Sequence, residues 1–125
     1  MVSQTRAVRI AERIHEELSD LLVREVQDAR LSGISITGVT VDRELAYATV
    51  FVSAVDGVSR ASEILAGLDH AAGYFRSQLS ARIELRVFPR LRFKWDSTLE
   101  RADRIETLFA SIRTNNDLNQ PDQDK

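Results

Sequence analysis

Residues 83–95 read IELRVFPRLRFKW and carry the clearest alternating pattern in the chain. Its odd positions are apolar and most of its even positions are charged, with Phe88 the apolar exception. Neighbouring side chains of a strand point to opposite faces, so the alternation predicts a strand with cations on one face. Pro89 cannot donate a ladder hydrogen bond, which implies an edge position or a local break. The cations of this face are Arg86, Arg90, Arg92 and Lys94.

Two more strands are predicted earlier in the chain, at residues 34–41 and 45–53. The apolar phase of the first slips at Gly38, which suggests a β-bulge. The second alternates cleanly, and both of its faces are partly apolar, which favours a central position in a sheet. Residues 42–44 form a short polar connection, so the two strands are expected to pair as an antiparallel hairpin.

Three amphipathic helices complete the pattern. The first covers residues 5–28, with a stripe of apolar side chains at spacings of three and four. The second starts near Ser59, and Gly73 inside it indicates a kink or a close helix approach. A capping box at residues 97–100 opens the third, whose stripe is Leu99, Ala102, Ile105, Leu108 and Ile112.

The order helix, strand, strand, helix, strand, helix indicates an α+β fold. It is the order of a type II KH-like domain, with a three-stranded sheet and helices on one face. KH domains clamp single-stranded nucleic acid with a G-x-x-G loop, and no two of the glycines here are three apart. We therefore expect one KH-like domain at residues 1–114, followed by an acidic, disordered tail at 115–125.

Charge is unevenly distributed along the chain. The net charge is −2, and residues 115–125 account for it, with Asp117, Asp122 and Asp124 against Lys125. Residues 76–94 instead carry six cations against Glu84 alone, a net of +5. Arginine suits phosphate recognition, and although a general preference for arginine could explain its abundance, it does not explain the clustering. The predicted RNA-binding residues are Arg76, Arg82, Arg86, Arg90, Arg92 and Lys94, with Arg6, Arg9 and Arg13 from the first helix.

Several function classes find no support in the sequence. The absence of cysteine excludes disulfides, thiol nucleophiles and cysteine zinc sites. His15, expected on the charged side of the first helix, and His70 match no metal-ligand spacing, and no phosphate loop or nucleophile elbow is found. No apolar run is long enough to span a membrane, and the N-terminus lacks a signal-peptide core. We expect a cytoplasmic monomer that is not an enzyme and takes no cofactor, metal or small-molecule substrate.

The chain resembles the ribosome-binding factor A family from about Arg6 to Ile112. The resemblance rests on residues 9–14 (RIAERI), 25–31 (EVQDARL), 36–41 (ITGVTV), 48–53 (ATVFVS), 71–76 (AAGYFR) and 85–93 (LRVFPRLRF), and on Asp96, Ser97, Glu100, Arg104 and Ile105. In this family an Ala-x-Gly kink, here Ala71 and Gly73, stands where KH domains have G-x-x-G. Ala29 departs from the family, which usually has proline there.

This resemblance implies a bacterial factor that binds the free small (30S) ribosomal subunit transiently and performs no catalysis. The factor would assist late maturation of 16S rRNA near its 5′ region and then leave, its release coupled to a GTPase. Two other readings stay open at this point: a KH-like protein–protein interaction module using the apolar edge of strand 45–53, and a small acid/base enzyme using His70. Tyr74 and Phe75 could stack on bases, although the stripe position of Phe75 favours the core.

Overall fold

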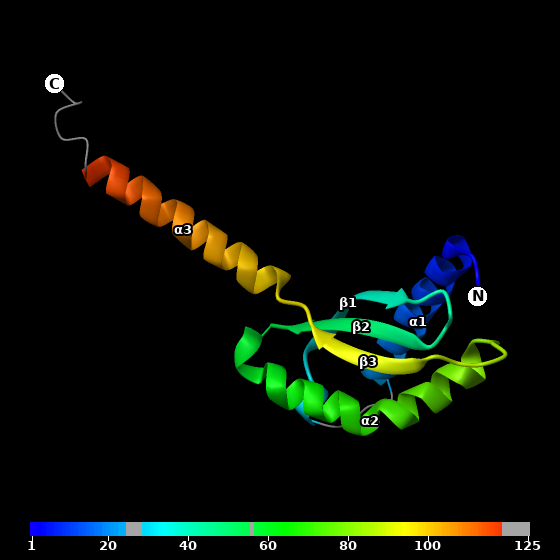
Figure 1. Ribbon diagram of the computed structural model, residues 1–125. Coiled ribbons are helices and arrows are strands. Elements are labelled where there is room, and N and C mark those ends of the chain that lie inside the picture. Colours follow the sequence, from blue (N-terminus) through cyan, green and yellow to red (C-terminus); the bar gives the residue numbers. More distant parts are fainter. Residues whose placement is uncertain (25–28, 56, 119–125) are drawn as a thin grey trace.

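The computed structural model describes residues 1–24, 29–55 and 57–118. Its elements follow the predicted order, so the α+β class is confirmed (Figure 1). They are helix α1 (Gln4–Arg24), the 3₁₀ turn η1 (Ala29–Leu31), strands β1 (Ile34–Val41) and β2 (Tyr47–Ala54), the 3₁₀ turn η2 (Gly57–Arg60), helix α2 (Ala61–Arg82), strand β3 (Arg90–Trp95) and helix α3 (Thr98–Leu118). The predicted end of the first helix at residue 28 lies outside the described residues.

The three strands form one mixed sheet in the order β1-β2-β3. Strands β1 and β2 pair antiparallel, and the register shifts between Ile36 and Gly38, which confirms the predicted hairpin and bulge. Strand β3 pairs parallel to β2 at the sheet edge. Because β2 is hydrogen-bonded on both sides, the edge of strand 45–53 proposed as a protein-binding surface is not available, and that expectation is wrong.

The β1–β2 connection is organised by one carboxylate, and β2 therefore starts two residues later than predicted. Asp42 accepts the backbone N–H of Tyr47 at 2.7 Å and that of Ala46 at 3.2 Å. Leu45 adopts a left-handed backbone with φ of 58°, and its N–H donates to the Asp42 carbonyl at 2.9 Å. These bonds turn the chain before the ladder begins at Tyr47.

The third strand begins at Arg90, and the prediction that it spans residues 83–95 is wrong at its N-terminal half. Pro89 has no N–H to donate to a strand ladder. The Arg76 guanidinium donates hydrogen bonds to the carbonyl of Phe88 at 2.6 Å and to that of Pro89 at 3.2 Å. The ladder starts when the N–H of Arg90 donates to the carbonyl of Ala46 at 2.9 Å. Arg86 consequently precedes the strand, and the predicted row of strand cations is reduced to the three that follow Pro89.

Helices α1 and α2 cover one face of the sheet, with α1 against β1 and α2 against β3. Their apolar stripes meet the inward side chains of β2 and β3 in one core. Phe75 is fully buried there and lies edge-on to Phe93, with ring centroids 6.3 Å apart, which confirms the core position expected for it. The fully buried aliphatic side chains include Ile14, Leu18, Leu21, Val50, Val52, Ile64, Leu68 and Leu79.

Helix α2 is continuous across Gly73, as one helix, and its ribbon bends near mid-length (Figure 1). A Cβ placed on Gly73 would meet no atom within 4 Å, which rules out a close approach there. The close approach is at Gly67 instead, where a Cβ would lie 3.1 Å from Leu31 Cδ2. The glycine in close contact with another element is thus Gly67 and not Gly73.

Helix α3 leaves the body at the end of β3 and projects away from it (Figure 1). The expectation that all helices cover one sheet face is therefore wrong for α3. More than half of the surface of each apolar side chain in its described stripe is exposed, for Ile105, Leu108, Phe109 and Ile112. The helix runs to Leu118, beyond the predicted domain boundary at residue 114. The remainder of the predicted tail, residues 119–125, lies outside the described residues.

Candidate nucleic-acid interface

One face of the sheet is left uncovered by α1 and α2. The register places Tyr47 beside Arg90, Thr49 beside Arg92 and Phe51 beside Lys94. Since Val50 and Phe93 of the intervening pairs point into the core, these side chains point to the opposite side. We call this surface the open sheet face, and its outward residues on β2 and β3 are Tyr47, Thr49, Phe51, Arg90, Arg92 and Lys94.

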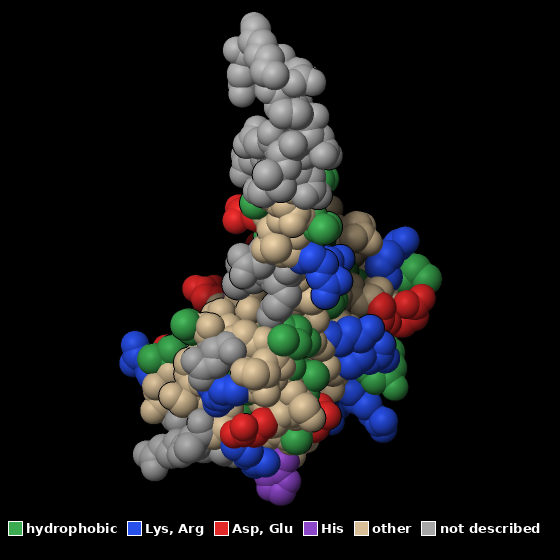
Figure 2. Space-filling model, turned by 90° about the vertical axis from the view of Figure 1, so that its left-hand side faces the viewer, with side chains coloured by type: hydrophobic (Ala, Val, Ile, Leu, Met, Phe, Trp, Pro, Cys, Tyr) green, Lys and Arg blue, Asp and Glu red, His purple; other side chains and the backbone are tan. Residues whose placement is uncertain are grey.

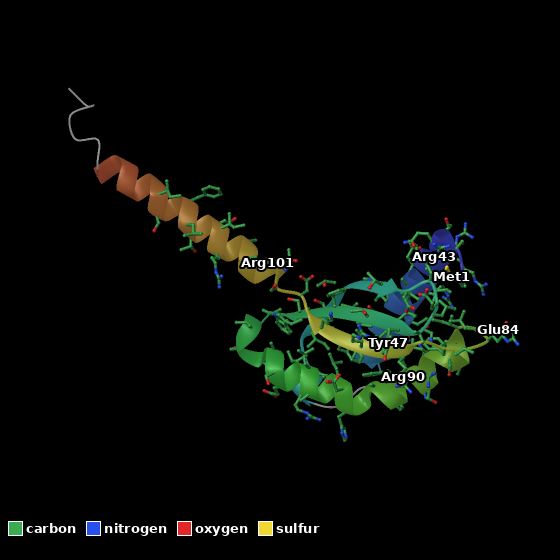
Figure 3. The ribbon with its side chains drawn as sticks, viewed as in Figure 1. Met1, Arg43, Tyr47, Glu84, Arg90 and Arg101 are labelled. Carbon is green, nitrogen blue, oxygen red and sulfur yellow. The ribbon has the colours of Figure 1, made fainter. Side chains whose placement is uncertain are left out.

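The cations of the open sheet face have few protein partners. Arg92 Cζ lies 4.0 Å from the ring centroid of Tyr47, a cation–π contact. Within the described parts of the chain, Arg90 and Lys94 form no ion pair, and both are exposed. Figure 3 shows Tyr47 and Arg90 close together on neighbouring strands. Three positive charges are therefore presented to solvent on one uncovered surface.

Two of the predicted RNA-binding arginines are instead held by acidic side chains of α1. Arg82, at the end of α2, lies 3.1 Å from Glu17 and 3.2 Å from Asp20. Arg13 lies 3.3 Å from the same Glu17 and donates to the Arg82 carbonyl at 3.4 Å. These partly buried contacts join the two helices on the covered side of the sheet.

Arg76 donates hydrogen bonds to the backbone carbonyls of Phe88 and Pro89, just before β3, and so has a structural role. Replacing it with alanine is expected to lower the free energy of unfolding by about 1–2 kcal/mol, because two charge-assisted hydrogen bonds are lost at a partly exposed site. Urea unfolding followed by circular dichroism measures the change. Arg86→Ala is the matched control, since the exposed Arg86 has no ion pair among the described residues and its loss should change stability by less than about 0.5 kcal/mol. Equal stability of both variants would contradict the structural role of Arg76.

Arg6 and Arg9 form a separate basic region on α1. Both are exposed, and the first turn of the helix holds no acidic residue. The N-terminus before them is tied to the hairpin, since the N–H of Val2 donates to the Arg43 carbonyl at 2.8 Å and Arg43 Nε donates back to Val2 at 3.0 Å. The nine predicted residues therefore do not form one surface. In the view of Figure 2, Lys and Arg side chains gather along the right-hand edge of the body, with acidic side chains among them.

The carboxylate of Asp96 connects three elements at the base of α3. Its Oδ2 accepts the Thr37 hydroxyl of the β1 bulge at 2.5 Å, and its Oδ1 accepts the N–H of Thr98 at 2.9 Å. Asp96 thus accepts one of the N–H groups at the start of α3. The Glu100 side chain of the predicted capping box at residues 97–100 lies outside the described residues. Mainly the hydrogen bond from Thr37, and then those from Thr98, lower the pKa of Asp96 from 3.8 to about 2.

This shift predicts a pH-dependent contribution of Asp96 to stability. A carboxylate whose pKa is lowered by folding stabilises the protein above its unfolded pKa, and the contribution is lost as the pH falls from 3.8 toward about 2. Asp96→Asn should therefore lower the melting temperature at neutral pH. The difference between wild type and variant should shrink across that acid window. Thermal unfolding at a series of pH values measures it, and a difference independent of pH would contradict this prediction.

The two histidines form no catalytic or metal site in the described residues. His15 is half-buried with Nε2 3.0 Å from the Ile36 carbonyl, so its expected place on the charged side of the helix is wrong. His70 is exposed on α2. No group of three or more potential metal ligands is found among the residues described, and no helix in that part of the chain is long and apolar enough to cross a membrane.

Sequence reasoning identified the cations of the open sheet face but missed two neighbours. The sequence predicts Tyr47 as a strand residue on the same face as Thr49 and Phe51, but it does not mark Tyr47 as a binding residue. Asp42, whose pKa is lowered chiefly by the hydrogen bond from the Tyr47 backbone, was read as part of a polar connection. The positions of Tyr47 and Asp42 beside Arg92 follow from the pairing of β2 with β3, which the sequence alone does not show.

Comparisons with known proteins find one family along most of the chain. A family model described as "Ribosome-binding factor A" matches residues 6–109. The ribosome-binding factor A of Nitrosomonas europaea is 41% identical over 105 residues, which cover 84% of this chain and 90% of that protein. The factor of Desulforamulus reducens is 38% identical over 109 residues, 87% of this chain and 91% of that protein.

A crystal structure and a fitted homology model share the fold. The crystal structure of ribosome-binding factor A from Thermus thermophilus superimposes with a TM-score of 0.63 at 20% identity, covering 70% of this chain and 93% of that one. A Thermus thermophilus ribosome-binding factor A homology model, fitted into the cryo-EM map of a 30S complex, gives a TM-score of 0.52 at 24% identity and covers 68% of this chain and 94% of that one. From the sequence match along most of its length, this chain belongs to the ribosome-binding factor A family.

Proposed function

We propose that the chain binds the free small (30S) ribosomal subunit and assists late maturation of its 16S rRNA, including the 5′ region. Membership of a family of ribosome-binding factors supports a binding role without catalysis. So does the related protein that has been fitted into a 30S complex. The observation that carries the proposal is the open sheet face, where Arg90, Arg92 and Lys94 are exposed together.

The geometry gives the predicted RNA-binding residues different roles in this proposal. Arg90, Arg92 and Lys94 form the main contact with rRNA phosphates, and Arg86 extends it from the segment before β3. Arg6 and Arg9 form a second contact from α1. The arginines that are tied to other groups, Arg13, Arg76 and Arg82, act as positioning residues that hold α1, α2 and the start of β3 together.

Phosphate contacts suit this target for a physical reason. Folded RNA presents phosphates and shape, and its deep, narrow major groove cannot be read by side chains. Phosphate contacts fix position and orientation without reading sequence, so cations on a rigid sheet are sufficient. We propose that the chain does this as a monomer in the cytoplasm, with no cofactor.

Binding of the purified chain to free small subunits across a salt series tests the proposal. Each phosphate neutralised should add roughly 0.7–0.9 to the slope of log K against log salt. Co-sedimentation gives the affinity, and assembled ribosomes are the control, to which binding should be weaker. Absence of binding to free subunits, or affinity independent of salt, would contradict the proposal.

The site on the rRNA can be found by directed cleavage. The chain has no cysteine, so Ser35→Cys, at an exposed position of β1, provides a single attachment point for an iron chelate that generates hydroxyl radicals. Cleavage of 16S rRNA in its 5′ region is expected. Cleavage confined to other regions of the rRNA would still support binding to the subunit, but it would contradict the proposed contact with the 5′ region.

A further inference from the structure

The open sheet face contains a hollow at the end of β1 and the start of β2. It is a shallow concavity, open to solvent, with a volume of about 440 Å³. All three strands contribute to its walls. The lining residues are Thr40, Val41, Asp42, Tyr47, Thr49 and Arg92. The hollow therefore combines an aromatic ring, a guanidinium group, a carboxylate and hydroxyl groups in one place.

Its most informative feature is the contact between Tyr47 and Arg92. The guanidinium carbon lies over the ring, 4.0 Å from its centroid, and Tyr47 is 40% exposed. In the ladder Arg92 is directly opposite Thr49, so its side chain reaches along the sheet to lie over Tyr47. Aromatic rings and guanidinium planes are the surfaces on which proteins stack unpaired bases. Tyr47 and Arg92 thus bring together two groups of the kind on which a nucleobase can stack.

The rim of the hollow can contact the edge of a base. Asp42 receives one backbone hydrogen bond on each carboxylate oxygen, from Tyr47 and from Ala46. A carboxylate oxygen can accept more than one hydrogen bond, so both oxygens keep acceptor capacity toward the hollow. The exposed Thr40 hydroxyl and that of Thr49 can donate or accept. An amino group on a base would find its acceptor at Asp42, as cytosine does at acidic side chains in DNA complexes.

Cations that could hold the attached phosphates are next to the Tyr47–Arg92 pair. Arg90 lies beside Tyr47 in the register, and Lys94 follows on the same face (Figure 3 labels Tyr47 and Arg90). Neither forms an ion pair with a described residue. The arrangement of stacking groups with positive charge along one side is that of single-stranded nucleic-acid sites.

We propose that the hollow receives the base of an unpaired nucleotide of the small-subunit rRNA, stacked on the Tyr47–Arg92 pair with its phosphate toward Arg90. The site would select single-stranded segments, because a base within a helix cannot enter it. This inference rests on the proposed function, since it names the RNA feature that the same face would bind.

Two variants that keep the shape or the charge of the site test the stacking. Tyr47→Leu removes the ring and keeps apolar bulk, and Arg92→Lys removes the planar group and keeps the charge. Each should weaken binding to a single-stranded RNA that contains 2-aminopurine, and to free small subunits, by roughly fivefold to a hundredfold. The slope against salt should stay the same, and the quenching of 2-aminopurine fluorescence on binding should diminish.

Tyr74→Leu is the matched control, because Tyr74 is a comparably exposed tyrosine on α2 and lies outside the hollow. It should leave affinity and quenching unchanged. Circular dichroism checks that each variant folds. If Tyr47→Leu does not fold, Arg92→Lys alone tests the site. If both site variants bind and quench as wild type while Arg90→Ala with Lys94→Ala loses affinity, the nucleotide site is rejected and the proposed function stands. If the wild-type chain fails to bind free subunits, both are rejected.

Discussion

A variant carrying Arg90→Ala and Lys94→Ala is expected to bind free small ribosomal subunits about a hundredfold more weakly than wild type. A hydrogen bond to a charged group contributes roughly 1.5–3 kcal/mol, and two such contacts would be lost. Both residues are exposed on the open sheet face and support no described ion pair, so the fold should tolerate their removal. The slope of log K against log salt should also fall by roughly 1.5, since two fewer phosphates are neutralised.

The control for this variant changes the net charge equally at other places. Arg24→Ala with Arg104→Ala removes two exposed arginines, one paired with Asp20 at the end of α1 and one on α3. If binding depends on the open sheet face, this control should lose less than about threefold in affinity at physiological salt, because long-range attraction is screened. Equal losses in the two variants would show that binding follows net charge and would reject the assigned face.

Replacing Phe75 with alanine is expected to lower the free energy of unfolding by about 3–5 kcal/mol. The side chain is fully buried between α2 and the sheet and lies edge-on to Phe93. A domain is typically stable by only about 5–15 kcal/mol, so the variant should be partly unfolded at moderate temperature. Equilibrium unfolding in urea at low temperature measures the loss.

Tyr74, the residue before Phe75, provides the control variant for this prediction. Tyr74 is 47% exposed and lies edge-on to Phe75, with ring centroids 5.9 Å apart. Tyr74→Ala should therefore cost clearly less than Phe75→Ala, because about half of the Tyr74 surface is already in contact with solvent. If Phe75→Ala proved as mild as Tyr74→Ala and instead reduced RNA binding selectively, Phe75 would be a base-stacking residue and its placement in the core would be wrong.

Much of the fold could be predicted because side-chain periodicity is a local property. Alternation over residues 45–53 and 90–95 showed which side chains share a face, and glycine at the phase slip located the bulge at Gly38. Errors occurred where contacts distant in sequence override the local pattern. Alternation continued through residues 83–89, but Pro89 and the Arg76 guanidinium remove the donor and acceptors that a ladder there would need.

The candidate site was predictable only in part, for the same physical reason. Sequence identifies a cation, but the identity of its partner depends on packing. Arg82 and Arg90 look alike in a basic stretch, yet α1 brings Glu17 and Asp20 to Arg82, while Arg90 is exposed. The hollow likewise depends on the parallel pairing of β2 with β3, which places Arg92 over Tyr47.

The class of the fold, the order of its elements and the positions of the cations along the chain could all be derived from the sequence. These follow from periodicity, turn residues and motif spacing, all of which act over a few neighbouring positions. Only the tertiary structure decided which arginines remain available, where β3 begins and that α3 projects from the body. Each of these depends on which groups meet across the molecule, and hydrogen bonds and ion pairs form between groups that are near in space whatever their separation along the chain.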